Sequence, residues 1–207
     1  MNVPLAALRA AMEHLARDLV DDDPRSGTVI GALEEVNRMG RTVQELVEYS
    51  TPPRPMPLKC TVEEIVYSAR QRLPHEQRGR IAIAREERGA SLTVDGPLLA
   101  KCLSRLIENA LEAGSGEVLL SVRRNETETV FATLNRDVRA EIDWDWALSA
   151  FRTNKPDHLG LGLTLVRRDV ELMGGELELS HTPGGETSAL VRVPNQPSPT
   201  DEEEPLP

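Results

Sequence analysis

The sequence predicts an α+β protein in which an N-terminal helical hairpin precedes a domain that mixes helices with strands. Two long segments before residue 50 repeat apolar residues at the three- and four-residue spacing of amphipathic helices. A proline-rich linker, 51–57, follows, and beyond it short β-prone runs alternate with further helical patterns. We therefore expect a hairpin domain at 1–55, an α/β domain at 56–195, and an acidic, disordered tail at 196–207.

Composition restricts the class of protein. The 207 residues carry a formal net charge of -10, which argues against a nucleic-acid partner. Two cysteines, Cys60 and Cys102, are too few for a disulfide framework and favour a cytoplasmic protein. No apolar run approaches the roughly 18 residues of a membrane span, and the N-terminus lacks the form of a signal peptide. We expect no membrane span, and we expect any sensing part to lie elsewhere or on another chain.

Two helices, over 4–20 and 28–50, make the predicted hairpin. Their apolar stripes consist of Leu5, Leu8, Met12, Leu15 and Leu19 in the first helix, and of Val29, Leu33, Val36, Met39, Val43 and Leu46 or Val47 in the second. A single hairpin cannot bury both stripes well, so we expect a homodimer whose hairpins form a four-helix bundle. The alternative is a hairpin that packs on its own C-terminal domain.

Local signals place the elements between the linker and residue 122. Thr61 has Glu64 three residues later, which is the capping-box pattern that begins a helix, here 62–73. The other predicted elements are strands at 58–60, 81–84, 91–94 and 118–122 and a helix with a broad apolar face at 97–113.

The stretch Phe151–Gly175, FRTNKPDHLGLGLTLVRRDVELMGG, holds the strongest functional signal. A polar loop leads through Gly160 and Gly162 into an amphipathic helix, and a glycine pair ends that helix. Free backbone N–H groups and the dipole at a helix N-terminus make an anion site, and glycine lets a phosphate approach the backbone closely. The alternative is a plain loop–helix junction in which the glycines serve only for turning.

This stretch and the residues after it resemble the C-terminal part of the histidine-kinase ATP-binding domain, a GHKL domain. That family reads F-F-T-T-K-P, a spacer, G-x-G-L, a helix, H-G-G, a strand, a glycine turn and a strand ending in L-P. The residues in register are Phe151, Thr153, Lys155, Pro156, Gly160, Gly162, Leu163, Gly174, Gly175, Gly185, Thr187 and Pro194. The resemblance implies a Bergerat-type α/β sandwich, with a mixed sheet on one side and helices on the other. It also implies an ATP site that includes Thr153, Lys155, Gly160, Gly162 and Leu163.

A second motif, RLIENALEA, resembles the N-box of the same family, N-L-x-x-N-A, whose last two positions Asn109 and Ala110 match. The resemblance implies that Asn109 helps to hold the Mg ion that bridges the nucleotide phosphates, and an amide oxygen suits this hard cation. The alternative is a helix residue that hydrogen-bonds to a neighbouring loop. Arg105 stands where related ATPases place a Glu as general base, and Arg cannot take a proton. Hydrolysis by that mechanism is therefore not expected, although Arg105 can pair with a phosphate.

The resemblance fails at the D-x-G-x-G box, whose Asp accepts a hydrogen bond from the adenine amino group in the family. Aligned from Phe151 with one deletion, the box falls on Asn135, Asp137 and Arg139 and contains no glycine. Asn135 retains an acceptor oxygen for adenine, and a shifted register would give this role to Asp137. Side chains at Val138 and Arg139 should crowd the base.

Two tryptophans, Trp144 and Trp146, follow this box where the family has a polar, mobile lid. Their indoles either cover or fill the nucleotide pocket, or one of them packs under the lid while the other lies at the surface.

The hairpin resembles the histidine-kinase dimerisation domain, whose first helix carries H-E-x-x-x-P-L with the phosphoacceptor His. The matching residues are Pro4 and Leu5 for the P-L and Tyr49, Ser50, Pro52 and Pro53 for the end of the second helix. The acceptor position lies before Met1, so no acceptor His is in register unless the true start lies upstream. His14 lies about 15 residues past that position, on another side of the helix, and we expect it to face solvent.

Three functions are consistent with these observations. The first is a histidine-kinase-like two-component signalling protein whose C-terminal domain binds ATP and Mg and whose autokinase activity is impaired. The second is a non-catalytic dimeric docking, regulatory or phosphotransfer-type protein that does not bind ATP and serves response-regulator receiver domains or a partner kinase. The third is a stand-alone GHKL ATPase, which Arg105 disfavours. The tail is either solvated or docks a partner.

Overall fold

The computed structural model describes residues 3–19, 23–84, 89–114, 116–136, 143–155, 158–182 and 185–195. The chain divides into two compact units. One consists of Met1–Pro52 and Phe151–Leu161, and the other of Pro53–Ala150 and Gly162–Pro207. In the part of the chain that is described, no helix is long and apolar enough to cross a membrane.

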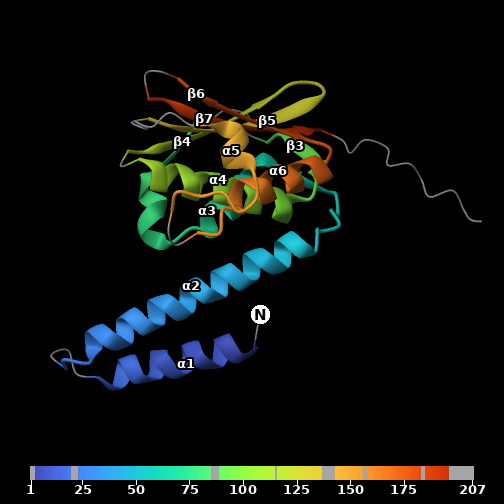
Figure 1. Ribbon diagram of the computed structural model, residues 1–207. Helices are drawn as coiled ribbons and strands as arrows, with labels where there is room; N and C mark the ends of the chain where they lie inside the picture. Colours follow the sequence, from blue (N-terminus) through green and yellow to red (C-terminus); the bar gives the residue numbers. More distant parts are fainter. Residues whose placement is uncertain are drawn as a thin grey trace, which may run out of the picture. The chain divides into compact units, whose positions relative to one another are not determined.

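The first unit is built on two helices, α1 (Val3–Asp18) and α2 (Ser26–Ser50), which run antiparallel and pack along each other (Figure 1). Both lie within two residues of the predicted segments. Val29 and Val36 are buried, but other large apolar side chains of the two helices stay more than 40% exposed. These exposed residues are Leu8, Leu15, Ile30, Met39, Leu46, Val47 and Tyr49. One hairpin therefore leaves much of both stripes in water, as the sequence pattern predicted.

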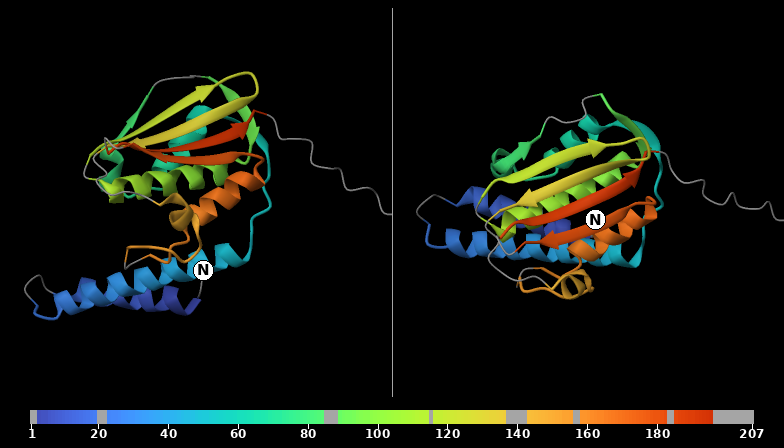
Figure 2. Two further views of the ribbon diagram at one scale, coloured as in Figure 1. Left: turned by 45° about the horizontal axis from the view of Figure 1, so that its top comes forward. Right: turned by 90° about the horizontal axis from the view of Figure 1, so that it is seen from above.

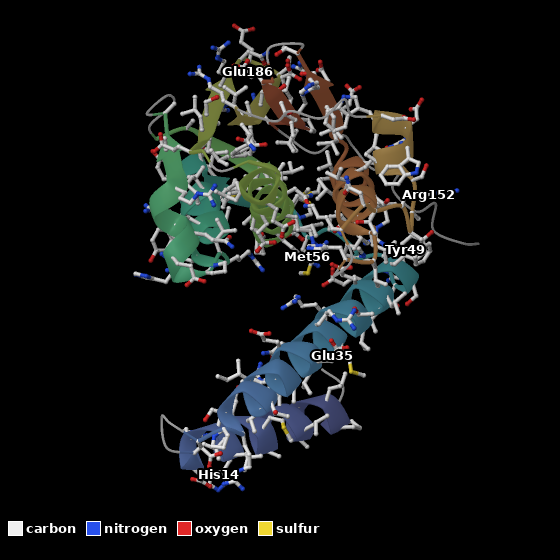
Figure 3. All side chains as sticks on the ribbon, turned by 60° about the vertical axis from the view of Figure 1, so that its left-hand side comes forward. His14, Glu35, Tyr49, Met56, Arg152 and Glu186 are labelled. Carbon is white, nitrogen blue, oxygen red and sulfur yellow. The ribbon has the colours of Figure 1, made fainter. Side chains whose placement is uncertain are left out.

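His14 lies on α1 toward the hairpin loop, and Tyr49 lies near the opposite end of the hairpin (Figure 3). The side chain of His14 is 76% exposed and approaches the carboxylate of Asp18 at 3.5 Å. The expectation that His14 faces solvent is therefore confirmed.

The second unit has two layers, with a mixed five-stranded sheet on one side and the helices on the other (Figures 1 and 2). The strand order is β2 (Ile81–Ile83), β4 (Val118–Arg124), β5 (Glu128–Asn135), β7 (Thr187–Pro194) and β6 (Glu176–His181). The pairing of β2 with β4 is parallel and the other pairings are antiparallel. This is the arrangement of mixed sheet and helices that the family resemblance implied.

The central strand β5 was missed in the sequence analysis, although its sequence ETVFATLN carries a strand signal. Its residues alternate strictly between half-buried and buried, and Phe131 on the helix-facing side is fully buried. Leu99, Leu103 and Ile107 of helix α4 (Gly96–Ala113) belong to the same core cluster. The sheet and α4 thus share one apolar core, which places the end of β5 beside the last turn of α4.

A small antiparallel pair, β1 (Leu58–Thr61) and β3 (Ser91–Val94), precedes α4. The capping box of α3 (Val62–Gln71) is confirmed, because the Glu64 amide donates to Thr61 Oγ1 at 3.2 Å and the Thr61 amide donates to Glu64 Oε2 at 2.8 Å. Helix α3 ends two residues before the predicted position, since the residue before Pro74 is disfavoured in a helix. A 3-10 turn, η1 (His75–Arg80), follows it. The predicted strands β2 and β3 belong to different sheets.

Asn195, at the end of β7, joins the small sheet to the large one. Its amide N–H donates to the Thr127 carbonyl at 2.9 Å, and its carbonyl accepts from the Thr93 amide of β3 at 2.9 Å. Its side chain donates to the Asn125 carbonyl at 2.9 Å and accepts from Thr129 Oγ1 at 2.7 Å. All four polar groups of this buried residue are thus satisfied, one by Thr93 of β3 and three by the turn between β4 and β5 and the start of β5.

Asn195→Ala should lower the free energy of unfolding by about 1–3 kcal/mol, because it leaves the buried Thr129 hydroxyl and the Asn125 carbonyl without a partner. Urea unfolding followed by circular dichroism measures this loss. The control is Asn154→Ala, which changes an exposed residue and should stay within about 0.5 kcal/mol of the parent. Equal stability of the two variants would mean that the side-chain hydrogen bonds of Asn195 do not stabilise the second unit.

Candidate functional site

Helix α4 carries the predicted magnesium ligand. Asp95 caps its first turn by accepting the Leu98 amide at 2.9 Å, and a buried apolar face that includes Leu103 and Ile107 sets its rotation on the sheet. Asn109 lies beside this face and is half-buried. The same helix packs against α6 (Gly162–Leu172), the helix that follows the predicted phosphate loop.

Asn109 and Gly162 face each other within the second unit. A Cβ atom added to Gly162 would lie 3.8 Å from Asn109 Nδ2, with no other contact within 4 Å. Among the residues that the structure describes, Asn109 has no hydrogen-bond partner, so the alternative of a bond to a neighbouring loop is not seen. The first residue of α6 therefore leaves open space beside an amide side chain, and nothing in the packing requires a glycine there.

Gly160 differs, because its own backbone requires glycine. Its φ is +71°, in the left-handed region, and an added Cβ would lie 2.4 Å from the Arg152 carbonyl oxygen. The Gly160 carbonyl accepts the amide of Phe151 at 3.1 Å. Phe151 also has a positive φ, of 62°, and its ring meets the edge of Tyr49 with centroids 5.5 Å apart. The left-handed backbone conformation thus explains the glycine at position 160, but it does not explain the glycine at position 162.

Of the other predicted residues of this stretch, Thr153 and Lys155 belong to the first unit and Leu163 belongs to the second. In the first unit, Thr153 Oγ1 accepts the Lys155 amide at 3.0 Å, which shapes the loop that carries both residues. In the second unit, Leu163 is partly buried against the core next to Gly162. The loop and the start of α6 are therefore each defined locally.

Asn135 ends strand β5 and is 2% exposed. Its Nδ2 donates to the carbonyl of Ala110, one of the carbonyls in the last turn of α4 that have no partner within the helix. Among the residues that the structure describes, its buried Oδ1 has no hydrogen-bond partner. A carboxylate could not donate to Ala110, so an amide suits this position, and it leaves one acceptor oxygen available for a ligand.

Neighbouring residues hold this acceptor in place. A Cβ on Gly114 would come within 3.1 Å of Asn135 Oδ1, so the loop after α4 packs closely on Asn135 and leaves little room for a side chain. Thr187 is the register partner of Asn135 on β7, and its hydroxyl lies 3.0 Å from His181 Nδ1. His181 was missed in the sequence analysis, because it comes next to Thr187 and Asn135 only through the pairing of β6, β7 and β5.

Part of the predicted box lies outside the described residues, namely Asp137, Val138 and Arg139. The tryptophans after it begin a short helix, α5 (Trp144–Leu148), which Asp143 caps. Trp146 is 40% exposed and Trp144 is half-buried, so neither indole fills a closed pocket. One of the two lies at the surface, as one of the two sequence-based alternatives expected.

Burial disfavours the thiolate form of both cysteines. Burial, together with the nearby charge of Asp169, raises the pKa of the Cys102 thiol to about 12, and burial also raises the pKa of Cys60. Within the described ranges, no three His, Cys, Asp or Glu residues gather to hold a metal ion. The donor set fits a Mg ion that keeps most of its ligands from phosphate and water, with one amide oxygen from Asn109.

Comparison with known proteins identifies the fold and the family. A family model described as histidine kinase-, DNA gyrase B-, and HSP90-like ATPase matches residues 94–197, half of the chain. This chain belongs to that family. The histidine-kinase-like ATPase region therefore contains α4, β5, α6 and the Asn135 acceptor, in the second unit.

Similar proteins include a signal transduction histidine kinase and a sensor protein. Over 125 residues the chain is 31% identical to the signal transduction histidine-protein kinase AfsQ2 of Streptomyces coelicolor, a match that covers 57% of this chain and 23% of that protein. It is 29% identical over 202 residues to the sensor protein DivL of Caulobacter vibrioides, covering 94% and 24%. The chain thus spans about a quarter of the length of these relatives.

Solved structures share the fold at low sequence identity. Full-length ShkA in complex with AMPPNP superposes with a TM-score of 0.73 and 17% identity, covering 95% of this chain and 47% of that chain. The histidine kinase ThkA in complex with the response regulator protein TrrA gives a TM-score of 0.69 at 15% identity, covering 95% and 59%. Together with the family match, these likenesses show a two-component histidine-kinase ATP-binding core.

The two loop glycines should respond differently to alanine. Gly160→Ala places a side chain at positive φ and against the Arg152 carbonyl, and it should lower the free energy of unfolding by about 1–2 kcal/mol or more. Gly162→Ala meets no obstacle and removes a flexible residue from a helix, so it should change stability by less than about 1 kcal/mol. Thermal unfolding of both variants without ligand tests this difference, and equal losses would contradict it.

Proposed function

We propose that this chain binds ATP with Mg as the nucleotide-binding part of a two-component signalling protein, and that its autokinase activity is impaired. The proposed site consists of Asn109, Asn135, Thr153, Lys155, Gly160, Gly162 and Leu163, with Asp137 as a further candidate. In this proposal residues 56–195 form the nucleotide-binding domain and residues 1–55 the dimerisation domain. The observation that carries the proposal is the buried, unpartnered Oδ1 of Asn135.

A buried acceptor without a partner destabilises a protein by about 1–3 kcal/mol, so a ligand that donates a hydrogen bond there gains that free energy. Adenine offers an amino donor on its six-membered ring, whereas guanine has a carbonyl at the same position. Asn135 cannot rotate its amide to donate instead, because its Nδ2 is held by the Ala110 carbonyl. The fixed acceptor therefore favours adenine over guanine nucleotides.

The phosphate end of the site rests on α6 and Asn109. The first amides of α6 have no partner within the helix, and Gly162 lets an anion approach them. The Asn109 amide oxygen can then hold a Mg ion, whose contribution when bound is to neutralise phosphate charge. Arg105 cannot act as general base, which disfavours water activation by the residue at that position.

Impaired phosphoryl transfer is proposed because the adenine box departs from the family. Between Asn135 and Arg139 the sequence has no glycine, so side chains replace the open backbone on which the base would lie. The same departure supports an alternative function, a non-catalytic docking or regulatory protein. In either case we propose a response-regulator receiver domain or a partner kinase as the partner. Support comes from ThkA, which was solved with a response regulator protein.

Thermal unfolding with nucleotides tests the site. ATP with Mg at 100-fold excess over its dissociation constant should stabilise the protein by about 2.7 kcal/mol, and GTP with Mg should stabilise it less. Asn135→Leu should remove the preference for ATP, because leucine has a similar shape but no acceptor. Asn109→Ala should remove the part of the shift that depends on Mg.

The control variant is Asn37→Ala, on α2, which should keep the full response to ATP. The unliganded melting temperature of every variant shows whether it is folded. The absence of any shift at millimolar ATP would contradict nucleotide binding and favour the docking function.

The exposed stripes of the hairpin support a homodimer. Apolar side chains that recur along α1 and α2 in water destabilise an isolated hairpin, and a second hairpin can cover them in a four-helix bundle. We therefore propose that residues 1–55 dimerise. Val36 is already buried within one hairpin, so exposed positions such as Leu8 and Met39 are the ones that report on assembly.

Leu8→Glu combined with Met39→Glu should make the protein monomeric, because each carboxylate would be buried without a partner at a cost of several kcal/mol. Light scattering coupled to size exclusion measures the mass at micromolar concentration. The control is Arg41→Glu, which changes the net charge by the same two units at an exposed position and should leave the dimer intact. A monomeric parent protein would contradict the bundle.

A further inference from the structure

An open groove with a volume of about 610 Å³ lies in the second unit. Strand β3 forms one side, and Lys59, Arg124, Glu126, Thr127 and Asn195 contribute the rest of its lining. None of these residues belongs to the proposed nucleotide site. The groove is therefore a separate surface, which neither the family match nor the nucleotide proposal explains.

The charged lining of the groove is mainly basic. Lys59 is exposed on β1 and Arg124 ends β4, and within the described ranges neither forms an ion pair. The acidic residue of the lining is Glu126, in the turn between β4 and β5, and it is exposed. Two cations that share a concave surface with one carboxylate, and that form no ion pair in the described part of the chain, favour a ligand that carries several negative charges.

A segment with several negative charges begins directly after Asn195, at the edge of the groove. The four hydrogen bonds of Asn195 hold the backbone at the wall of the groove, and the chain continues from there into residues 196–207. This segment reads QPSPTDEEEPLP and contains four consecutive carboxylates at 201–204 and no basic residue. Six residues span at most about 20 Å, so the acidic run is tethered close to Lys59 and Arg124.

We propose that the acidic segment 201–204 of this chain docks into the groove and pairs with Lys59 and Arg124. Each exposed ion pair is weak alone. A short tether, however, holds the carboxylates at an effective concentration of order millimolar, so weak pairs suffice for docking. The docked segment covers a basic surface that would otherwise attract acidic partners. This inference is independent of nucleotide binding.

Carbodiimide coupling tests the proposal, because it joins an amine to a carboxylate only where the two are in contact. Lys59, Lys101 and Lys155 are the lysines of the sequence, so the chain supplies its own comparison. Peptide mapping by mass spectrometry of the full chain should find 201–204 joined to Lys59, and joined much less to the other two. The yield should not depend on protein concentration, and it should fall in 0.5 M salt.

Proximity along the chain alone would also favour Lys59, and substitutions separate the two causes. Arg124→Glu, and the milder Arg124→Gln, should lower coupling at Lys59 by about threefold, because an attractive charge is lost. The matched control is Arg123→Glu, the adjacent residue of β4, whose side chain points to the opposite face of the sheet. It should leave the yield unchanged, and melting curves show that each variant is folded.

Three results would overturn the proposal. Equal coupling of 201–204 to the three lysines would show a segment without a docking site. Equal effects of the Arg124 and Arg123 substitutions would show that only net charge or tethering matters. Coupling that rises with protein concentration would assign the groove to the acidic segment of a second copy.

Discussion

The packing of α4 on the central strands is the constraint on which the rest of the second unit depends. The buried face of this helix, with Leu103 and Ile107 at its centre, lies against a sheet in which Phe131 is fully enclosed. Because interiors pack densely, this contact fixes the rotation of the helix about its axis. That rotation turns Asn109 toward the start of α6 and brings the Ala110 carbonyl to the end of β5. The polar site is thus a by-product of apolar packing.

Helix ends explain why polar groups gather at this place. The last carbonyls of α4 and the first amides of α6 have no partners within their own helices. Asn135 satisfies one of these carbonyls and keeps its own oxygen unpartnered, and Gly162 leaves the first turn of α6 accessible. A ligand with a donor at one end and negative charge at the other matches both features. Each feature is also physically unfavourable, or at least unnecessary, without a ligand.

The sequence was sufficient for the parts of this arrangement that depend on short-range order. The apolar spacing of α4 and α6, the Thr61 capping box and the paired loop glycines each involve residues fewer than five positions apart. Strand β5 was missed although the alternation of ETVFATLN is a local strand signal of the same kind. The distinction between Gly160 and Gly162 required the structure, since both occur in the same motif and only one has a positive φ.

Contacts between distant residues were beyond reach from the sequence. Asn195 bonds to Thr129 and to Asn125 across separations of 66 and 70 residues, and no local pattern marks it. The two roles of Asn135 likewise depend on a carbonyl 25 residues earlier. Compared with the family motif, Asn135 stands where an Asp is expected. In the structure the amide makes a hydrogen bond that a carboxylate cannot make, so the substitution is compatible with both folding and adenine recognition.

Strand β5 relates the two surfaces proposed here to each other. It begins at Glu128, opposite Pro194 and next to the groove, and ends at Asn135, opposite Thr187 and in the proposed nucleotide site. At about 3.3 Å per residue, the two ends lie roughly 23 Å apart. The strand is paired on both sides along most of its length, with β4 and with β7, so it behaves as a rigid rod. Coupling between distant sites requires an element that can adopt two arrangements. A strand paired in this way has only one arrangement. Occupancy of the groove should therefore leave the Asn135 acceptor where it is, and the acidic segment would act on partners of the protein rather than on its nucleotide.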